Sequence, residues 1–437
     1  MSTQAPVTLE KLVALCKRRG FVYQSAEIYG GLNGVYDFGP MGTLMKQNIR
    51  AAWMRSMHQA PGEIVFFEGA ILDPEAVWKA SGHVENFSDP MVDCLNCKHR
   101  YRADDIDLNK ACPHCGKTAW TQVRQFNMMF STQVGANADQ ASIAYLRPET
   151  AQAIFVNFKN VLSTSRVKMP FGIAQIGKAF RNEITPKQFL FRMREFEQME
   201  MEWFCKADNA LHDFETWSQA RRTFYATIGI DEKKIRLRPH EKGELAHYST
   251  LCNDVEYQFP FGWKEIEGIA HRGTFDLSQH STHSGKDLSV FDEETKTSYT
   301  PTVVECSVGV DRLFLTLLFD AYYEDVVESE PRVVLRLHPS IAPIKAAFFP
   351  LSKQLNEPTL ALYSAIKKLG YSVQFDESGS IGKRYRRQDE IGTPLCFTYD
   401  FDSQQDNKVT VRNRDTTQQE RISIDQVARY MQEYLGK

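Results

Sequence analysis

The chain has 437 residues and a mass of 50.1 kDa; 42% of its residues are apolar and 24% are charged. This composition is typical of a folded protein of about two or three domains, and it excludes fibrous and disordered chains. A chain of this length buries roughly three quarters of its extended surface, so it needs no disulfide or metal merely to form a core. The formal net charge of −3 argues against a protein that coats nucleic acid or anionic membrane with its whole surface.

The charge is unevenly divided along the chain. Residues 331–437 contain 16 Lys and Arg against 12 Asp and Glu, a net charge of +4. This leaves 36 against 43, a net charge of −7, for residues 1–330. A terminal module that binds a polyanion and a random scatter of surface charge explain this division about equally well.

The cysteine pattern and the N-terminal residues indicate the cellular compartment of the protein. The first twenty residues lack the basic start, apolar core and small-residue cleavage site of a signal peptide. No apolar run approaches the roughly 18 residues needed to span a bilayer. The nine cysteines are an odd number, and five are scattered without pattern: Cys16, Cys205, Cys252, Cys306 and Cys396. We therefore expect reduced thiols, a cytoplasmic location and no membrane partner.

Two amphipathic helices are predicted near the N-terminus. Apolar residues recur at three-to-four spacing in residues 8–19 and again in residues 42–57. Residues 88–122 differ, because they are polar, poor in aliphatic side chains and contain the other four cysteines. They predict a small insertion rather than a part of the core.

Strands and a domain boundary are predicted further along the chain. Residues 173–202 alternate between apolar and polar side chains, which indicates strands. A long apolar helix follows Gly309 and ends in the acidic stretch EDVVESE before Pro331. We expect the boundary there, between a domain of residues 1–330 and a domain of residues 331–437.

The second domain is expected to be a compact α/β module of about one hundred residues. The stretches KAAFFPL, PTLALYSAIKKLG and YSVQF predict strand, helix and strand, and a basic amphipathic helix then precedes the strand PLCFTYDF. KVTVR adds another strand, and a final helix is expected at Val427–Leu435.

Four clustered cysteines have nearly the spacing of a metal site. Two C-x2-C pairs are separated by fourteen residues: Cys94, Cys97, Cys112 and Cys115. This separation is one residue shorter than the usual window for two such pairs that bind one metal ion. Each pair can bind a tetrahedral ion from one tight turn, so structural Zn2+ is favoured over a disulfide or a chance pairing. Four sulfurs complete the coordination, so the nearby His99 and His114 are expected to be surface residues.

The two predicted strands have one apolar and one polar face. Alternation places these residues together on the polar faces: Gln175, Gly177, Ala179, Arg181 and Glu183, and on the second strand Arg194, Phe196, Gln198 and Glu200. The opposite faces contain Ile176, Phe180, Met199, Met201 and Trp203. Joined by ITPKQFLFR, the strands would pair as an antiparallel hairpin. A charged face can simply be solvated, but arginine and glutamate on both strands favour a cleft for a phosphorylated, cationic and flat ligand.

A third segment, PTVVECSVGVDRLFLTLLF, predicts a strand that continues into a helix at Gly309. Glu305, Ser307 and Gly309 share one face of the strand. Arg312 falls in the first helical turn, where the helix dipole and the guanidinium both favour an anion. Taken alone, an arginine in a first turn is more often a surface residue.

Taken in order, these segments resemble the conserved motifs of the class II aminoacyl-tRNA synthetases. FRNE at Phe180–Glu183 and FRMREF at Phe191–Phe196 resemble the second motif, residues 309–312 the third, and the helix at residues 42–57 the dimer-forming first motif. Further stretches are similar to bacterial homodimeric glycyl-tRNA synthetases over nearly the whole chain: IYGGLNGVYDFGPMG from Ile28, SGHVENFSDPM from Ser81, RYRADD from Arg100, LRPETAQ from Leu146 and GSIGKRYRRQDEIGTP from Gly379.

The resemblance implies an α+β fold. A class II antiparallel sheet flanked by helices would contain the small zinc-binding insertion with its four cysteines, and a C-terminal α/β anticodon-binding domain would follow. It implies a homodimer with glycine, ATP and tRNA(Gly) as partners, and Mg2+ beside Zn2+. A basic cluster would contact the tRNA backbone: Lys383, Arg384, Arg386 and Arg387. Salt bridges to Asp389 and Glu390, or a domain interface, explain this cluster nearly as well.

The resemblance also implies an ATP site. Arg181 would contact the α-phosphate, Glu183 the adenine or the metal, and Arg312 the γ-phosphate, and these three would be the catalytic residues. Phe196 would stack on adenine. The full set is Arg181, Asn182, Glu183, Phe191, Arg192, Met193, Arg194, Glu195, Phe196, Glu265, Ile266, Gly309, Val310, Asp311 and Arg312.

A glycine site is implied in the same way. Glu149, Glu200 and Glu305 would bind the ammonium group, and a cavity filled by protein atoms would exclude any side chain by sterics. Ser307 stands where class II enzymes generally have the first glycine of a Gly-x-Gly, and the glycine-specific family has this serine. The full set is Arg102, Glu149, Phe196, Glu197, Gln198, Met199, Glu200, Glu305, Cys306, Ser307, Val308 and Gly309.

The implied function is a two-step ligase that forms glycyl-adenylate from glycine and ATP and then transfers the glycyl group to the 3′ end of tRNA(Gly). One alternative is a non-catalytic nucleic-acid-binding relative of this fold, such as a polymerase accessory subunit. Another is a sister synthetase for a different small amino acid. An accessory subunit could lose the motif arginines and the pocket acids, and this chain has all of them: Glu149, Arg181, Glu183, Glu200, Glu305 and Arg312.

Overall fold

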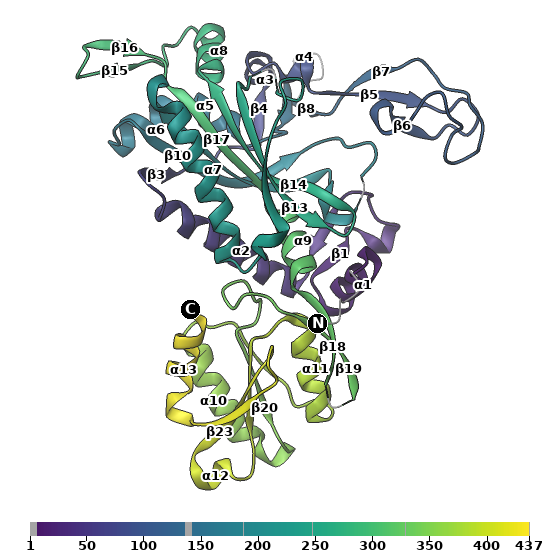
Figure 1. Cartoon of the computed structure of the whole chain (residues 1–437), viewed down its shortest axis with the longest axis vertical. Helices are drawn as coiled ribbons and strands as arrows, with labels where there is room; N and C mark the ends of the chain where they lie inside the picture. Colours follow the sequence, from purple (N-terminus) through teal and green to yellow (C-terminus); the bar gives the residue numbers. More distant parts are fainter. Residues whose placement is uncertain (1–6, 136–141, 187, 247, 328, 437) are drawn as a thin grey trace.

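The computed structural model describes residues 7–135, 142–186, 188–246, 248–327 and 329–436. The chain forms a larger unit built on a mostly antiparallel sheet and a smaller C-terminal unit, drawn one above the other in Figure 1. The expected α+β class is confirmed.

The central sheet has the strand order β12-β13-β14-β17-β11-β10-β3 within the described residues. Its strands are β3 Glu63–Phe66, β10 Phe171–Phe180, β11 Glu195–Cys205, β12 Ile235–Pro239, β13 Leu251–Phe259, β14 Gly262–Gly273 and β17 Thr302–Gly309. Neighbouring strands are antiparallel except β3 and β10, which are parallel. The predicted hairpin is present as β10 and β11, with Gln175 opposite Glu200.

The two faces of this sheet differ in polarity because side chains alternate along each strand. One face buries Ala174, Met199, Met201, Trp203, Val304, Cys306 and Val308 in the main apolar core. Phe314 of α9 and Trp217 of α7 belong to the same core. The other face contains the predicted polar series, as expected, but its far end buries Phe171, Ile173, Phe204 and Val303 in a second apolar cluster.

The helices of the larger unit surround the sheet (Figure 1). They are α1 Leu9–Arg19, α2 Pro40–His58, α3 Glu75–Ala80, α4 His83–Asn86, α5 Ala151–Val156, α6 Phe158–Ser165, α7 Ala210–Thr227, α8 Phe275–Ser284 and α9 Val310–Ala321. The helices predicted at residues 8–19 and 42–57 are α1 and α2. Thr8 caps α1 by accepting a bond from the Lys11 amide, and Gly20 ends it with a left-handed φ of 74°.

The polar strands are shorter than predicted. β10 ends at Phe180 and β11 begins at Glu195, so Arg181, Glu183 and Arg194 lie in the connection between the strands. The Arg181 amide still bonds the Arg194 carbonyl at 2.9 Å, but the next amide turns away to the Met128 carbonyl. This second partner ends the hairpin ladder, and no alternation within the hairpin could predict it.

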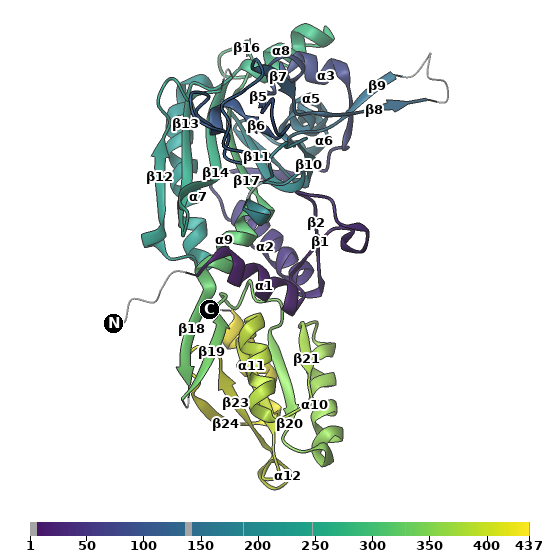
Figure 2. The ribbon, with the colours of Figure 1, turned by 90° about the vertical axis from the view of Figure 1, so that its right-hand side faces the viewer.

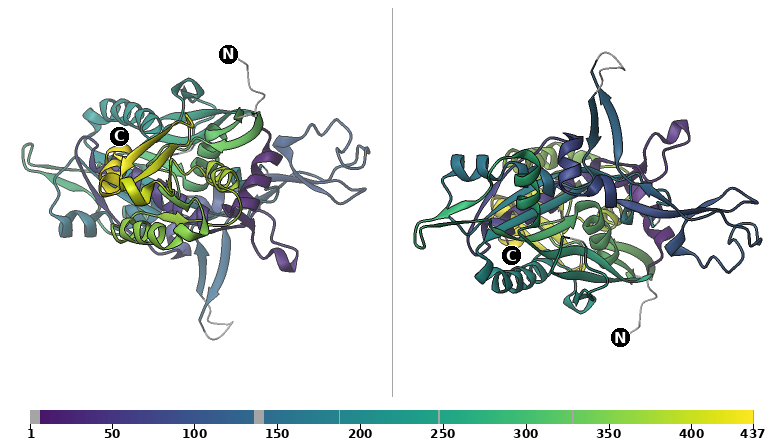
Figure 3. Two further views of the ribbon diagram at one scale, coloured as in Figure 1. Left: turned by 90° about the horizontal axis from the view of Figure 1, so that it is seen from below. Right: turned by 90° about the horizontal axis from the view of Figure 1, so that it is seen from above.

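Small sheets project from the larger unit. The cysteine-containing insertion is built from β5 Ser88–Asp93, β6 Arg100–Arg102 and β7 Arg124–Asn127, and β8 Phe130–Val134 pairs with β9 Ser142–Leu146, which also pairs with β4 Leu72–Pro74. Figures 2 and 3 show that the insertion and the β8–β9 hairpin extend in different directions. Two further pairs complete the unit: β1 Val22–Gln24 with β2 Tyr36–Phe38, and β15 Val290–Asp292 with β16 Thr297–Tyr299.

The smaller unit has the predicted α/β pattern. Its elements are β20 Ala346–Pro350, α10 Asn356–Lys368, β21 Val373–Phe375, α11 Ile381–Ile391, β22 Leu395–Tyr399, α12 Ser403–Asp406, β23 Lys408–Asn413, β24 Gln419–Ser423 and α13 Val427–Leu435. The strand order is β21-β20-β22-β23-β24 in the described part of the chain. The expected strands and helices are all present, and β24 is an additional strand.

The packing of the apolar residues places the boundary between the larger and the smaller unit later in the chain than predicted. Tyr322–Val327 (β18) and Glu330–Leu335 (β19) pair as a hairpin, so the expected boundary at residue 331 lies inside a strand. Leu335, Leu337 and Ile344 belong to the core of the larger unit, whereas Ala346 belongs to the core of the smaller one. An acidic stretch before a proline resembles a linker, but here most of its described residues belong to the two strands of this hairpin.

Most of the basic cluster of α11 is used internally. Arg384 is buried and bonds the Pro350 and Gly379 carbonyls, and Arg387 pairs with Asp376 at 2.6 Å. Arg386 lies 3.7 Å from Asp389. Lys383 is exposed and has no partner among the described residues, so it is the member of the cluster most available for an external polyanion.

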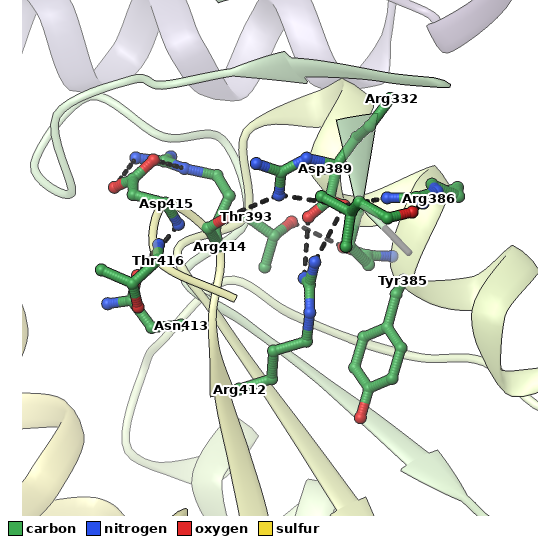
Figure 4. Close-up of polar contacts among 12 residues, drawn as sticks. Arg332, Tyr385, Arg386, Asp389, Thr393, Arg412, Asn413, Arg414, Asp415 and Thr416 are labelled. Atoms are coloured by element: carbon green, nitrogen blue, oxygen red, sulfur yellow. Dashed lines mark hydrogen bonds and ion pairs between the residues drawn. The ribbon is translucent and has the colours of Figure 1, made fainter. Parts of the chain in front are cut away.

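Asp389 is the centre of this arginine network (Figure 4). It accepts two bonds from Arg412, at 2.9 and 3.2 Å, and lies 3.5 Å from Arg332 of β19. The neighbouring Glu390 instead pairs with Arg18 and Arg19 of α1. The expected salt bridge is therefore present for Asp389, while Glu390 joins the two units.

Removal of Glu267 should strongly destabilise the larger unit. Its carboxylate is fully buried and accepts bonds from Arg221 at 2.6 Å and Tyr225 at 2.5 Å. Glu267→Ala leaves the Arg221 guanidinium buried without its counter-ion, which costs about 3–5 kcal/mol of unfolding free energy. Urea unfolding followed by circular dichroism measures this loss. Glu433→Ala, which breaks an exposed pair with Arg429, is the control and should change the unfolding free energy very little. Equal losses would contradict the role of burial.

Candidate active site

A cavity of about 520 Å³ opens on the polar face of the central sheet. Gln198 and Glu200 of β11, Glu305 and Ser307 of β17 and Gly268 of β14 line its floor. A Cβ at Gly268 would meet no atom within 4 Å, so its missing side chain adds to the open volume. Several polar atoms around the cavity are buried without a hydrogen-bond partner among the described residues: Asp89 Oδ2, Arg102 Nε, Glu183 Oε2 and Gln198 Oε1. Such atoms are what a bound polar ligand satisfies.

The inner end of the cavity is a cluster of carboxylates. Glu200 comes from β11, Glu305 from β17, and Glu149 from the turn before α5, and each is less than a tenth exposed. Gln152 donates to Glu149 at 3.0 Å, and His83 Nε2 lies 3.2 Å from it. Thr150 donates its hydroxyl to Glu200. The structure thus brings the three glutamates expected around an ammonium group to one place.

One arginine compensates this cluster. Arg272 near the end of β14 is 1% exposed, donates to Glu305, and forms a bidentate pair with Asp276 of α8 at 2.8 Å for both bonds. Its guanidinium also lies 3.8 Å from the centre of the Tyr248 ring. A planar fork suits two carboxylates at once, which lysine does not.

The carboxylates differ in proton affinity. Burial raises the pKa of Glu305 to about 8, although Arg272 acts against this shift. Burial and the charge of Glu149 raise the pKa of Glu200. Burial also acts to raise the pKa of Glu149, but His83, Arg272 and Gln152 together hold this pKa below the usual range. The pocket therefore contains at least one ionised carboxylate and one that titrates near neutral pH.

The outer end of the cavity combines arginines with aromatic rings. Arg181 bonds the Pro148 carbonyl at 3.0 Å, and its guanidinium lies 5.2 Å from the centre of the Phe196 ring. Arg312, in the first turn of α9, lies 4.4 Å from the Phe191 ring and 3.3 Å from Glu265 Oε1. This end can accept a flat ring and phosphate oxygens together.

Most residues of the two expected sets line the cavity, and some do not. The lining includes Arg102, Glu149, Arg181, Glu183, Phe191, Arg192, Met193, Phe196, Gln198, Glu200, Glu265, Ile266, Glu305, Ser307, Gly309, Asp311 and Arg312. Outside the lining lie Asn182, Arg194, Glu195, Glu197, Met199, Cys306, Val308 and Val310.

The reason for these exceptions is the strand period. Met199, Cys306, Val308 and Val310 are core residues on the helix-covered side. Glu197 is also on that side, where it pairs with Arg50 at 2.7 Å and Lys46 at 3.1 Å.

The other exceptions lie in the connection between β10 and β11 or at the first residue of β11. Arg194 bonds the Glu183 and Asn33 carbonyls at 2.8 and 2.6 Å, and Glu195 pairs with Lys178 at 2.5 Å. Their contacts are structural, so the expectation that they touch the ligand is not supported by their geometry.

Sequence reasoning missed residues that complete the cavity. His83, Gln152, Arg272 and Asp276 surround the carboxylates, and Asp89, His240, Tyr248 and Asp254 line the walls. Arg272 left a signal, since an arginine stands near the end of the strand EIEGIAHRG with an aspartate four residues later.

The cysteine cluster lies in the projecting insertion, away from the cavity. The sulfurs of Cys94 and Cys115 are 3.6 Å apart, and those of Cys97 and Cys112 are 3.8 Å apart. Zinc with bonds of about 2.3 Å to four sulfurs would separate them by about 3.8 Å, so the four residues fit a tetrahedral ion. His99 and His114 are exposed and stack on each other with ring centres 3.6 Å apart, as expected for surface residues.

No helix in the described residues is both long and apolar enough to cross a bilayer.

Comparison with known proteins is consistent with this geometry. Residues 345–434 match the family model of an anticodon binding domain. The glycine–tRNA ligase of Caldanaerobacter subterraneus is 52% identical, covering 98% of this chain and 99% of the relative. The glycine–tRNA ligases of Geobacillus thermodenitrificans and Clostridium beijerinckii are 49% and 48% identical, each over 97% of this chain.

The antiparallel sheet, the arginine-lined cavity and the C-terminal module define a class II aminoacyl-tRNA synthetase. Within that class the chain belongs to the glycine–tRNA ligase family, because relatives about half identical cover nearly its whole length. The non-catalytic accessory subunit is not favoured.

Loss of Arg272 should destabilise the protein in a pH-dependent way. Arg272→Met leaves Glu305 and Asp276 buried without their cation, which costs about 3–5 kcal/mol near pH 8. Loss of the Arg272 charge raises the pKa of Glu305 further, so the deficit is smaller at about pH 5.5, where Glu305 is protonated, than near pH 8. Denaturant unfolding of wild type and variant at both pH values measures this difference.

Lys296→Met, which removes an exposed pair with Glu293, is the matched control, and its small effect should not change with pH. A deficit for Arg272→Met that grows on acidification would show that Arg272 does not balance these carboxylates.

Proposed function

We propose that this chain activates glycine with ATP and transfers the glycyl group to tRNA(Gly), with the amino acid at the inner end of the cavity and the nucleotide at the outer end. The observation that supports this arrangement is the buried trio Glu149, Glu200 and Glu305 beside an arginine-lined opening. Three carboxylates suit an ammonium group, and guanidinium groups suit phosphates.

In the first step a glycine carboxylate oxygen attacks the α-phosphorus of ATP. A new bond forms between that oxygen and phosphorus, and the bond to the bridging oxygen breaks, so pyrophosphate leaves. Arg181 would contact the α-phosphate and Arg312 the γ-phosphate, while Phe196 would stack on adenine. The side chains supply position and charge rather than a covalent intermediate, and such preorganised charges are often the largest catalytic effect.

In the second step the terminal ribose hydroxyl of the tRNA attacks the glycyl carbonyl carbon, and AMP leaves. We assign no protein residue as general base for this step. The basic C-terminal unit supports binding of the anticodon end of the tRNA, and Lys383 is its exposed candidate for a phosphate contact.

Selection of glycine would rest on exclusion. Ser307 and Gln198, which bond each other at 3.2 Å, close the floor beside the ammonium site. A larger amino acid would have to displace buried, hydrogen-bonded groups, which costs far more than the loss of a single methyl contact.

Two metal ions are part of the proposal. Mg2+ would enter with ATP, and it prefers oxygen ligands such as the Glu265 carboxylate, which faces the outer cavity. Zn2+ would be held by the four cysteines as a closed structural site.

We also propose a homodimer formed through the region of α2, in line with the resemblance of that helix to the first motif. A cytoplasmic location remains a prediction.

Pyrophosphate exchange with separate amino acids tests the function. Exchange should occur with glycine and be weaker by at least about 10²-fold with alanine, serine and proline, because one excess group is excluded by packed atoms. Glu149→Ala should raise the KM for glycine by about 10–100-fold while the KM for ATP stays nearly constant. Preference for another amino acid would refute the glycine pocket, and equal losses for both substrates would show that Glu149 is misplaced.

Elemental analysis tests the metal site. The purified protein should contain about one zinc per chain, and Cys97→Ser with Cys112→Ser should lose it and unfold the insertion. Cys396→Ser, a buried cysteine of the smaller unit, is the control and should keep its zinc. A metal-free protein of full activity would contradict the structural role.

A further inference from the structure

One buried acid beside the pocket has no role in the proposed mechanism. Glu202 lies two residues after Glu200 on the same face of β11, directly opposite Glu305 in the strand register. Its side chain is completely buried, with an exposed fraction of 0%. It belongs to neither of the residue sets expected from the sequence.

Glu202 lies between Glu305 of β17 and the apolar Ile173 of β10, and these surroundings do not satisfy its carboxyl group. Neither carboxylate oxygen has a hydrogen-bond partner among the described residues. One oxygen each of Glu200, Glu202 and Glu305 lies within 4.8 Å of the others. Glu202 is thus an unpartnered buried acid that adjoins the two carboxylates proposed to bind the ammonium group.

Among the residues that the structure describes, no cation is left to pair with Glu202. Arg272 of β14 is already engaged by Glu305 and by Asp276 of α8, and the remaining neighbour is the acidic Glu200 of the same strand. Burial of an ionised carboxylate without a counter-ion or hydrogen bond costs far more than retention of a proton. Burial first, and then the charge of Glu305, raise the pKa of Glu202 well above its usual range.

We propose that Glu202 is a positioning residue of the glycine pocket: as a neutral carboxylic acid it donates its O–H to the Glu305 carboxylate when the ammonium group binds. This inference rests on the proposed function. A side-chain rotation brings the two groups into contact. Glu305 is the acceptor because it is the register partner, whereas Glu200 already accepts a bond from Thr150.

The geometry allows both interactions at Glu305. A carboxylate oxygen has two lone pairs, so it accepts from Glu202 and from the ammonium group together. The Glu202 proton also prevents a fourth negative charge in the pocket, where Glu149, Glu200 and Glu305 face one ammonium group. Glu202 therefore fixes the orientation of Glu305 without competing for the substrate's charge.

The test compares two replacements of Glu202 by pyrophosphate exchange, with separate KM values for glycine and ATP. Glu202→Gln keeps a neutral donor of the same shape, so the KM for glycine should stay within about threefold of wild type. Glu202→Leu keeps the volume and removes the donor, so this KM should rise about 10–100-fold while the KM for ATP is unchanged. Met201→Leu, the neighbour on the other face of β11, is the matched control and should change neither value.

Stability supplies a second readout. Because the Glu202 carboxyl group has no hydrogen-bond partner in the described part of the chain, Glu202→Leu should melt at or above the temperature of wild type. A Glu202→Leu protein that does not fold would contradict the inference. Kinetics of Glu202→Leu equal to those of Met201→Leu would also overturn it, and so would a loss in Glu202→Gln as large as that in Glu305→Gln.

Glu305→Gln separates this inference from the proposed function. If the pocket is correctly placed, that variant should raise the KM for glycine strongly, whatever the Glu202 variants do. An unchanged KM for glycine in Glu305→Gln would instead refute the pocket itself, and with it the role of Glu202.

Discussion

The buried contact between Arg272 and the carboxylates of Glu305 and Asp276 is the constraint on which the site depends. Without this guanidinium, the strands that pass beneath the cavity could not keep several acids away from water, because each uncompensated buried charge costs several kcal/mol. With it, the pocket keeps an excess of negative charge, which suits the ammonium group of the proposed glycine site. Arg272 thus stabilises the buried acids as their counter-ion, and its positive charge determines how much net negative charge the pocket retains.

The central sheet separates this charge from the core through the two-residue period of its strands. Met199, Met201 and Cys306 pack under α7 and α9, while Glu200, Glu202 and Glu305 alternate with them and face the opposite side. A shift of one residue in the pairing of β11 and β17 would exchange the two sets and bury the acids among apolar side chains. The register of these strands is therefore fixed strongly by both faces at once.

Alternation and motif spacing predicted much of this arrangement. They identified the β10–β11 hairpin, the polar face with Glu200 and Gln198, the strand-to-helix segment with Arg312, and nearly every element of the smaller unit. They could not identify Arg272 or His83, because the contacts of these residues join distant segments and follow only from the sheet order. They also misplaced Glu197, whose attraction to Lys46 and Arg50 of α2 is a tertiary contact. The boundary at residue 331 failed for the same reason, since residues 335–344 pack on the larger unit.

A crystal structure with a non-hydrolysable glycyl-adenylate analogue would show directly where the amino acid binds. The ammonium nitrogen should lie within about 3 Å of carboxylate oxygens of Glu149, Glu200 and Glu305, with the Arg272 contacts intact and adenine against Phe196. An ammonium group turned toward the outer cavity, or an inner pocket occupied by the adenine, would contradict this placement.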